Sequence, residues 1–228
     1  MAEINALAGR HSLHVIEDGA QSFGADYGNR KSCALSRIGC TSFFPSKPLG
    51  CYGDGGAVFT DDEALAQACR EIRVHGQSCR YRHTRLGVAG RMDTLQCAIV
   101  LAKLTRLEWE IERRIAIGRR YNDLFDRHGI GRVIQREGRT SVFAQYTVFV
   151  DNRDGAQRRL REAGIPTAIH YPAPLNEQPA YGAFSRTGPL PNAEKLSRRV
   201  LSLPMHAYLT DEIQDRIADV LIEAVSAA

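Results

Sequence analysis

The chain has 228 residues, enough for one large domain or a domain and a half, and its 43% hydrophobic and 25% charged residues are typical of a soluble globular protein. The formal net charge of +4, without any lysine–arginine block, does not suggest nucleic acid as a partner. No run of 18 or more apolar residues predicts a membrane span, and the first residues lack a signal pattern, so we expect a cytoplasmic protein.

The first half is predicted to alternate short strands with helices. Its apolar periodicity and turn residues indicate, in chain order, a helix over residues 3–8 that stops at Gly9, strands at 14–16, 41–44 and 57–60, a helix from Asp61 or Asp62 to 74, and a long helix over 93–124. Residues 22–37 and 77–90 have loop character, and the second loop is rich in arginine. Such a loop is either solvated or suited to an anionic ligand.

The second half changes character near Gly129 and is predicted to be a compact α+β unit, joined to the first half by the long helix. In chain order we expect a strand at 142–150, a helix over 154–163 that ends at Gly164, a strand at 167–170, a proline-rich loop at 171–191, and helices over 193–200 and 210–225.

Six cysteines lie in the first half and never form a CxxC pair. This spacing does not favour a zinc site, and the expected compartment does not favour disulfides. We therefore expect reduced core or loop thiols.

The most unusual stretch is residues 43–56, FFPSKPLGCYGDGG, in which Lys47 stands between two prolines and ahead of a glycine run. Proline biases the residue before it away from the helix, and glycine lets the backbone approach a ligand closely. Taken alone, the stretch is more simply explained as a surface turn that carries a lysine. The rest of the chain favours a functional interpretation.

Asp18 and Lys47 together suggest one chemistry. Asp18 follows the predicted strand at 14–16, and α/β folds place ligand-binding groups at such strand ends, although a turn cap explains it equally well. A lysine in a dry, glycine-rich loop suits attack on a carbonyl, and an aspartate can keep a pyridinium nitrogen protonated. Pyridoxal phosphate (PLP) enzymes require this pair, and the order of the two residues is compatible with it.

Several motifs occur in an order that resembles the DegT/DnrJ/EryC1/StrS family of sugar aminotransferases. They are, in chain order, 17–25 (EDGAQSFGA), 42–47 (SFFPSK), 53–56 (GDGG), 73–76 (RVHG), 87–93 (GVAGRMD), 170–172 (HYP) and 202–205 (SLPM). The chain looks most like the branch that aminates UDP-linked 3-keto-uronic acid sugars for O-antigen and lipopolysaccharide synthesis. The resemblance implies amino transfer from glutamate to a 3-keto sugar nucleotide, with pyridoxal 5'-phosphate as cofactor.

The resemblance also implies the fold class, which is α/β and part of fold type I of the PLP-dependent transferases, the aspartate-aminotransferase-like fold. It makes residues 1–115 the C-terminal part of the PLP-binding large domain and residues 116–228 the small α+β domain. In this family residues 87–91 reach the active site of the neighbouring subunit, which implies a homodimer.

Eight residues receive roles from the resemblance. The cofactor contacts are Lys47, which forms the Schiff base and moves the proton, Asp18 at the pyridine nitrogen, Gln21 beside the ring and its 3-hydroxyl, and Ser42 at the phosphate. The substrate contacts are His75, Arg91, His170 and Tyr171, of which Arg91 suits a carboxylate. A helix cap is the alternative for His75, and packing beneath the proline-rich loop is the alternative for His170 and Tyr171.

Three departures from the family pattern stand out. Ala89 occupies a position where an asparagine usually reaches the partner's cofactor phosphate, and Asn176 one where histidine is common. The resemblance also begins after the family's N-terminal portion, which carries a Gly-Thr phosphate-binding helix start and an aromatic that stacks on the pyridine ring. We therefore expect unpaired sheet edges and an uncovered apolar face.

Two interpretations follow from these features. The chain is either a PLP-dependent aminotransferase or a non-catalytic remnant of one that needs the missing N-terminal half. The intact Lys47, Asp18, Gln21 and Ser42 favour the first. A phosphate-binding module built on residues 53–56 is a weak third, because no GK[ST] follows.

Overall fold

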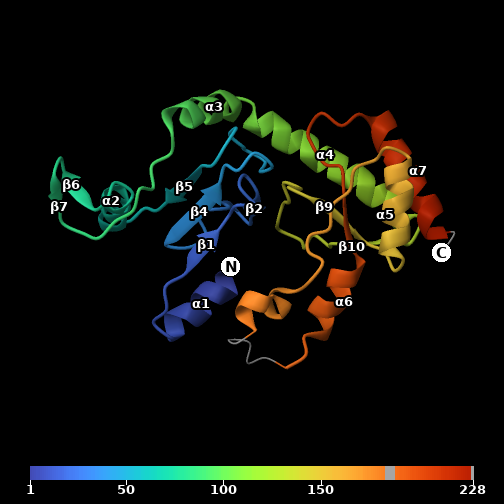
Figure 1. Cartoon of the computed structure of the whole chain (residues 1–228), viewed down its shortest axis with the longest axis horizontal. Coiled ribbons are helices and arrows are strands. Elements are labelled where there is room, and N and C mark those ends of the chain that lie inside the picture. The colour runs from blue at the N-terminus through green and yellow to red at the C-terminus, as the bar shows by residue number, and fades with distance from the viewer. Residues whose placement is uncertain (183–187, 227–228) are drawn as a thin grey trace. The chain divides into compact units, whose positions relative to one another are not determined.

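The computed structural model describes residues 1–182 and 188–226. The chain divides into two compact units, the first formed by Met1–Glu112 with Gln135–Ala144 and the second by Arg113–Ile134 with Gln145–Ala228. The long helix α4 (Leu107–Asp126), green in Figure 1, contributes residues to both. The domain division predicted between residues 115 and 116 stays a prediction. Within the described residues, no helix has both the length and the apolar character needed to cross a membrane.

The first unit is built on a sheet of three strands in the order β1-β4-β5. These strands are β1 (Ile16–Asp18), β4 (Ile38–Ser42) and β5 (Gly56–Phe59). β1 runs parallel to β4, with Asp18 opposite Cys40, whereas β5 runs antiparallel, with Gly56 opposite Ser42. The strand predicted at 14–16 thus lies two residues later, because pairing with β4 begins only at Ile16.

Helices and two small hairpins complete the first unit: α1 (Ala2–Arg10), β2 (Asp26–Tyr27) with β3 (Arg30–Lys31), α2 (Glu63–Ile72), β6 (Gln77–Cys79) with β7 (Arg82–His83), and α3 (Thr94–Leu104). Asp62 caps α2 as predicted, since its carboxylate accepts a hydrogen bond from the N–H of Leu65 at 3.0 Å. The predicted stop of α1 at Gly9 is wrong, because the helix continues through it to Arg10. Residues 77–90, predicted as a loop, contain the β6–β7 hairpin.

The single helix predicted over residues 93–124 is also wrong. α3 ends at Leu104, and α4 begins at Leu107. At the break, the hydroxyl of Thr105 donates to the backbone oxygen of Ala102 at 2.8 Å, a local bond that competes with the helical ladder. Val100 and Leu107, one on each side of the break, belong to the same buried core cluster. The apolar periodicity therefore continues where the helix does not.

The outer strands of the first sheet, β1 and β5, pair on one side only within the described residues. Ile16 on β1 is 64% exposed and Val58 on β5 is 54% exposed. The expected open edges and exposed apolar side chains are therefore present in this unit.

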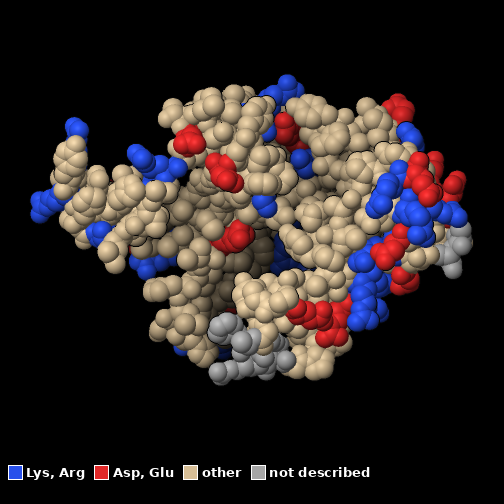
Figure 2. All heavy atoms as spheres, in the orientation of Figure 1, with Lys and Arg blue, Asp and Glu red and all other residues tan. Residues whose placement is uncertain are grey.

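The second unit is built on an antiparallel sheet in the order β10-β9-β8. Its elements, besides the greater part of α4, are β8 (Gly131–Arg132), β9 (Tyr146–Phe149), α5 (Arg153–Glu162), the short 3-10 helices η1 (Leu175–Glu177) and η2 (Pro179–Tyr181), α6 (Pro191–Arg199), β10 (Val200–Leu203) and α7 (Asp211–Ser226). Its core contains a cluster of three aromatic rings, in which Tyr121 stacks on Phe125 and the tilted ring of Tyr146 lies 4.7 Å from Tyr121 and 6.0 Å from Phe125 between centroids. Figure 2 shows acidic and basic side chains interspersed over α5 and α7.

Two predictions for the second unit need correction. The sequence pattern does not predict strand β10, because all four of its residues are buried and show no alternation. The helix predicted over 193–200 therefore wrongly includes Val200, the first residue of β10. The strand predicted at 167–170 is reduced to one bridge between Ala168 and Ser202. The proline-rich loop predicted at 171–191 contains η1 and η2, and its residues 183–187 lie outside the described part of the chain.

Candidate active site

Asp18 and Ser42 end neighbouring parallel strands, so they lie at the same edge of the sheet. Asp18 is exposed, and one of its carboxylate oxygens accepts a hydrogen bond from the N–H of Ala20 at 2.9 Å. The Ser42 hydroxyl accepts one from the N–H of Phe44 at 3.1 Å, which leaves its own proton available. Gln21 is exposed in the turn after β1. The structure thus places three of the predicted cofactor contacts at or just beyond the carboxyl ends of β1 and β4.

Glu17, which the sequence analysis gave no role, faces the opposite side of the sheet from Asp18 and is buried. Its carboxylate accepts hydrogen bonds from the N–H groups of Cys33 (2.7 Å) and Leu35 (2.9 Å) and from the Ser32 hydroxyl (3.2 Å). These donors satisfy the buried charge and hold β1 against the loop at residues 32–35. Glu17 therefore fixes the strand that presents Asp18.

Lys47 lies in the loop between β4 and β5, and the base of this loop is closed by backbone hydrogen bonds. Phe43 donates its N–H to the oxygen of Gly55 at 2.8 Å and accepts from the N–H of Cys51 at 2.7 Å. Lys47 donates its own N–H to the oxygen of Phe44 at 2.9 Å, which closes a tight turn. The Lys47 side chain is half-buried, and its ammonium makes no hydrogen bond or ion pair with the described residues.

Three further side chains hold the part of the loop that follows Lys47. The Cys51 thiol lies 2.9 Å from the oxygen of Phe43 and 3.0 Å from that of Gly53. From α3, the Lys103 ammonium donates to the oxygen of Gly50 at 2.5 Å, and the Gln96 amide oxygen accepts from the N–H of Tyr52 at 2.9 Å. None of these three contacts can be predicted from the sequence pattern, because all three are tertiary. The one available signal was the position of Lys103, three residues after the buried Val100 on the apolar side of its helix.

The residues present fit pyridoxal phosphate by the chemistry of their donors and acceptors. Within the described chain, Lys47 offers an amine without a partner, Asp18 a carboxylate oxygen beyond the one that accepts from Ala20, and Ser42 an available hydroxyl proton. These groups match an aldehyde, a ring nitrogen and a phosphate. Next to Asp18 the backbone needs glycine, since a Cβ on Gly19 would lie 2.3 Å from the Cys33 sulfur.

The thiols near Asp18 are poor competitors for Lys47 as nucleophile. Burial raises the pKa of the Cys33 and Cys40 thiols, and the carboxylates of Glu17 and Asp18 add to the increase. Both thiols therefore stay protonated near neutral pH and are weak nucleophiles. All six cysteines of the chain are free.

His75 and Arg91 are the predicted substrate contacts of the first unit. His75 has a φ of 58°, and its N–H donates to the oxygen of Val88 at 3.0 Å, so its backbone shapes the turn after α2 while its side chain is exposed. Arg91 is exposed and lines a cavity of about 1190 Å³, together with the further arginines Arg70 and Arg73. None of the four cofactor candidates, Lys47, Asp18, Gln21 and Ser42, lines this cavity.

His170 and Tyr171 belong to the second unit. The Nδ1 atom of His170 lies 3.1 Å from the Ser202 hydroxyl, which in turn lies 2.9 Å from the hydroxyl of Thr147. Tyr171 is 67% exposed, and its ring meets the His170 ring edge-on, with 5.5 Å between centroids. His170 is therefore held from behind by Ser202, and Tyr171 is open to a ligand.

Ala89 and Asn176, the two positions that depart from the family pattern, both lie in segments with hydrogen-bonded backbone. Ala89 forms an isolated bridge with Val74, and Asn176 lies half-buried in η1.

Comparison with protein families gives a match over residues 1–222 to the model described as the DegT/DnrJ/EryC1/StrS aminotransferase family. The chain belongs to this family. The predicted family is thereby confirmed from the first strand of the site to the last helix of the second unit.

Individual relatives agree with this family membership. A protein of Pseudomonas aeruginosa named UDP-2-acetamido-2-deoxy-3-oxo-D-glucuronate aminotransferase is 53% identical over 206 residues, which cover 90% of this chain and 57% of that protein. The crystal structure of a DegT DnrJ EryC1 StrS aminotransferase from Brucella abortus matches with a TM-score of 0.94 and 43% identity, covering 98% of this chain and 60% of the other. DesV of S. venezuelae, crystallised in complex with a ketimine intermediate, matches with a TM-score of 0.94 and 37% identity, covering 98% of this chain and 61% of DesV.

These matches confirm the predicted fold class, which is part of fold type I of the PLP-dependent transferases. The chain spans about three fifths of the length of the relatives it matches.

Proposed function

We propose that this chain carries the catalytic lysine and cofactor contacts of a PLP-dependent aminotransferase that acts on a nucleotide-linked keto sugar. The observation that carries the proposal is the position of Asp18 and Ser42 at the ends of neighbouring parallel strands, with the Lys47 loop directly after the second strand. Because the chain spans about three fifths of its relatives, the proposal concerns the activity of the complete protein.

Each cofactor candidate has a distinct task in this proposal. Bound PLP supplies an aldehyde that condenses with amines and a ring that accepts electrons from the reacting carbon. Lys47 provides the amine that holds the cofactor and, once released, the base that moves a proton at the substrate carbon. Asp18 accepts a hydrogen bond from the ring nitrogen and keeps it protonated, Ser42 donates to the phosphate, and Gln21 binds beside the ring hydroxyl.

The substrate side of the proposal rests on the relatives. The name of the P. aeruginosa protein supports a UDP-linked 3-oxo sugar acid as the acceptor. Glutamate as the amino donor is part of the proposal and follows from the family resemblance alone. We assign His75, Arg91, His170 and Tyr171 to the sugar nucleotide, with Arg91 as a bidentate donor to a carboxylate. A homodimer in which residues 87–91 serve the partner's site, a cytoplasmic location, and a role in O-antigen or lipopolysaccharide sugar synthesis complete the proposal.

Absorption spectroscopy with chemical trapping tests the proposal. PLP added to the purified protein should give a visible absorption band that is lost in Lys47→Ala and kept in Lys195→Ala, which changes an exposed lysine of the second unit. Borohydride reduction followed by peptide mapping should then place the cofactor on Lys47. A label on another lysine would overturn the assignment, and the absence of any band would favour the non-catalytic alternative.

A further inference from the structure

We infer that Lys103 and Gln96 of α3 are positioning residues, which hold the loop that carries Lys47 through the backbone of Gly50 and Tyr52. This inference rests on the proposed function, in which the Lys47 amine has to be placed precisely to react with the cofactor. Neither residue lies in the motifs quoted above for the resemblance, and both act on Lys47 only through the backbone.

The loop needs such support because it has little structure of its own. Between β4 and β5 the chain forms no strand or helix, and its backbone bonds gather at the base, where Phe43 meets Cys51 and Gly55. Beyond the base, the Lys47 N–H donates to Phe44, and Leu49, which is 3% exposed, anchors the following residues in the core cluster. A side chain on a loop is placed less precisely than one on a helix or a strand, unless a neighbouring element holds the loop.

Lys103 supplies this hold with a charged group. Its ammonium lies 2.5 Å from the Gly50 oxygen and 5.8 Å from the centre of the Tyr52 ring, and it is half-buried. No carboxylate pairs with it among the described residues. A cation held on a neutral carbonyl makes a stronger bond than a neutral donor would. Gly50 itself must be glycine, since a Cβ there would lie 2.6 Å from the oxygen of Pro45.

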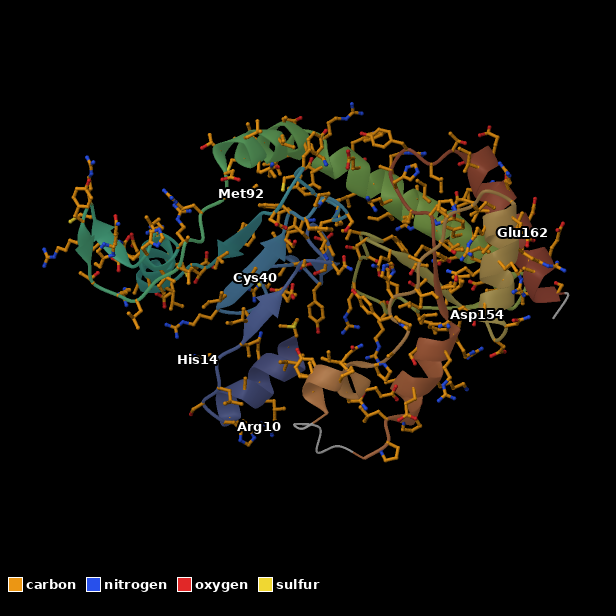
Figure 3. The ribbon with its side chains drawn as sticks, viewed as in Figure 1. Arg10, His14, Cys40, Met92, Asp154 and Glu162 are labelled. Carbon is orange, nitrogen blue, oxygen red and sulfur yellow. The ribbon has the colours of Figure 1, made fainter. Side chains whose placement is uncertain are left out.

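Gln96 holds Tyr52, two residues after Gly50, and Met92, just before α3, packs against the same loop. Its amide oxygen accepts the Tyr52 N–H, and a Cβ on Gly53 would lie 3.1 Å from its amide nitrogen, so side chain and loop are closely packed. Met92, labelled in Figure 3 where the chain approaches α3, is so close to Gly55 that a Cβ there would lie 2.6 Å from its terminal carbon. Met92 also directly follows Arg91.

Helix α3 therefore connects the loop that carries Lys47 with the segment that carries Arg91, which serves the partner's site in the proposed homodimer. One side of it holds the loop with the reacting amine, and its N-terminal end continues the segment with the substrate arginine. We expect changes at Lys103 or Gln96 to displace Lys47 without unfolding the protein, since neither side chain is part of the apolar core.

Two pairs of variants test the inference. Lys103→Met keeps the aliphatic stem and removes the donor, whereas Lys103→Arg keeps a cationic donor. Gln96→Leu removes the acceptor for the Tyr52 N–H, whereas Gln96→Glu keeps an acceptor oxygen. Lys195→Met, at an exposed lysine of α6, is the matched control. Each variant is made in the chain of 228 residues.

The first measurement is hydrogen exchange of the peptides that cover residues 48–55, and the second is the rate at which PLP and borohydride label Lys47. Loss of one such hydrogen bond should raise exchange and slow labelling by about fivefold to tenfold in Lys103→Met and Gln96→Leu. Lys103→Arg and Gln96→Glu should return within about twofold of the parent, and Lys195→Met should match it. The melting temperature serves as the control for global unfolding.

The outcomes separate this inference from the proposed function. If exchange rises but Lys47 is labelled at the parental rate, the loop is held without consequence for the amine and the inference is overturned. If the unmodified protein is labelled on a different lysine, the proposed function fails first, and the inference falls with it. If the Met and Leu variants slow labelling and the Arg and Glu variants restore it, both stand.

Discussion

The two compact units of the chain are of similar length but bury their side chains very differently. Of the ten largest side chains that are fully buried among the described residues, eight belong to the second unit, and only Val142 and Cys51 belong to the first. The first unit, in contrast, holds 16 of the 25 large hydrophobic side chains that are exposed among those residues. The unit with the cofactor candidates is thus the one that buries its apolar surface less completely.

The second unit thus contains most of the large, fully buried side chains, whereas the first unit contains the cofactor candidates. In the second unit, helices and an antiparallel sheet enclose a conventional core of aromatic and aliphatic side chains. In the first unit, the sheet has open outer strands among the described residues, and polar contacts add to the core cluster that contains Phe43, Leu49 and Cys51. Glu17 holds β1, whereas Gln96 and Lys103 hold the loop that carries Lys47. We therefore expect apolar truncations to be most damaging in the second unit and polar substitutions in the first.

The largest effect is expected for Leu201→Ala in strand β10. Leu201 is fully buried, so its truncation leaves a cavity and should lower the free energy of unfolding by about 2–5 kcal/mol. Leu101→Ala in α3 is the matched control, because Leu101 is 65% exposed and its truncation should change stability by less than about 0.5 kcal/mol. Urea titration of both variants checks the contrast, and equal losses would contradict it.

The second effect concerns neighbouring carboxylates in the first unit. Glu17→Gln should lower the free energy of unfolding by about 1–3 kcal/mol, because an amide nitrogen would face the N–H groups that now donate to the carboxylate. Asp18→Asn should leave stability within about 0.5 kcal/mol of the parent, since Asp18 is exposed and asparagine keeps the acceptor for Ala20. Urea titration measures both variants. A larger loss in Asp18→Asn than in Glu17→Gln would reverse the assignment of structural and chemical roles.

Much of the first unit could be predicted, because its signals are local. The cap at Asp62 and the existence of a strand near Asp18 and of one before Lys47 follow from residue types within a few positions of each other. The bounds are shifted, since the strands predicted at 14–16 and 41–44 are Ile16–Asp18 and Ile38–Ser42. The parallel pairing that brings Asp18 and Ser42 to one edge is the ordinary consequence of two such strands in one sheet.

The missed features share a physical cause, which is that they depend on contacts between distant segments. Strand β10 reads VLSL without alternation, because both of its faces are covered by elements far away in the sequence. The break at Thr105 is hidden, because Val100 and Leu107 face the same core. The bond from Lys103 to Gly50 joins residues 53 positions apart, and no periodicity encodes it.

A third and smaller effect is expected from acid, again in the first unit. Hydrogen bonds from Gln67 and Arg85 lower the pKa of Glu71, whose side chain is only 11% exposed. A lowered folded pKa means that this stabilisation is present above the ordinary glutamate pKa of about 4.3 and is lost as pH falls through the folded value. The parent and Glu71→Gln should therefore differ in urea midpoint at about pH 6–7, and this difference should vanish toward about pH 3. A difference that persists unchanged at the acidic limit would mean that the contact acts through packing and not through charge.

The smallest effect is the most informative about the open side of the first unit. Val58→Thr keeps a β-branched side chain on β5 and adds a hydroxyl, and because Val58 is 54% exposed the free energy of unfolding should change by less than about 0.5 kcal/mol. The same substitution at Val148, which is fully buried on β9, should lower it by about 1–3 kcal/mol, because the hydroxyl has to be buried. Urea titration of the two variants compares the sheets directly. If Val58→Thr is as damaging as Val148→Thr, then strand β5 is covered in solution, and the incomplete burial of the first unit does not extend to this strand.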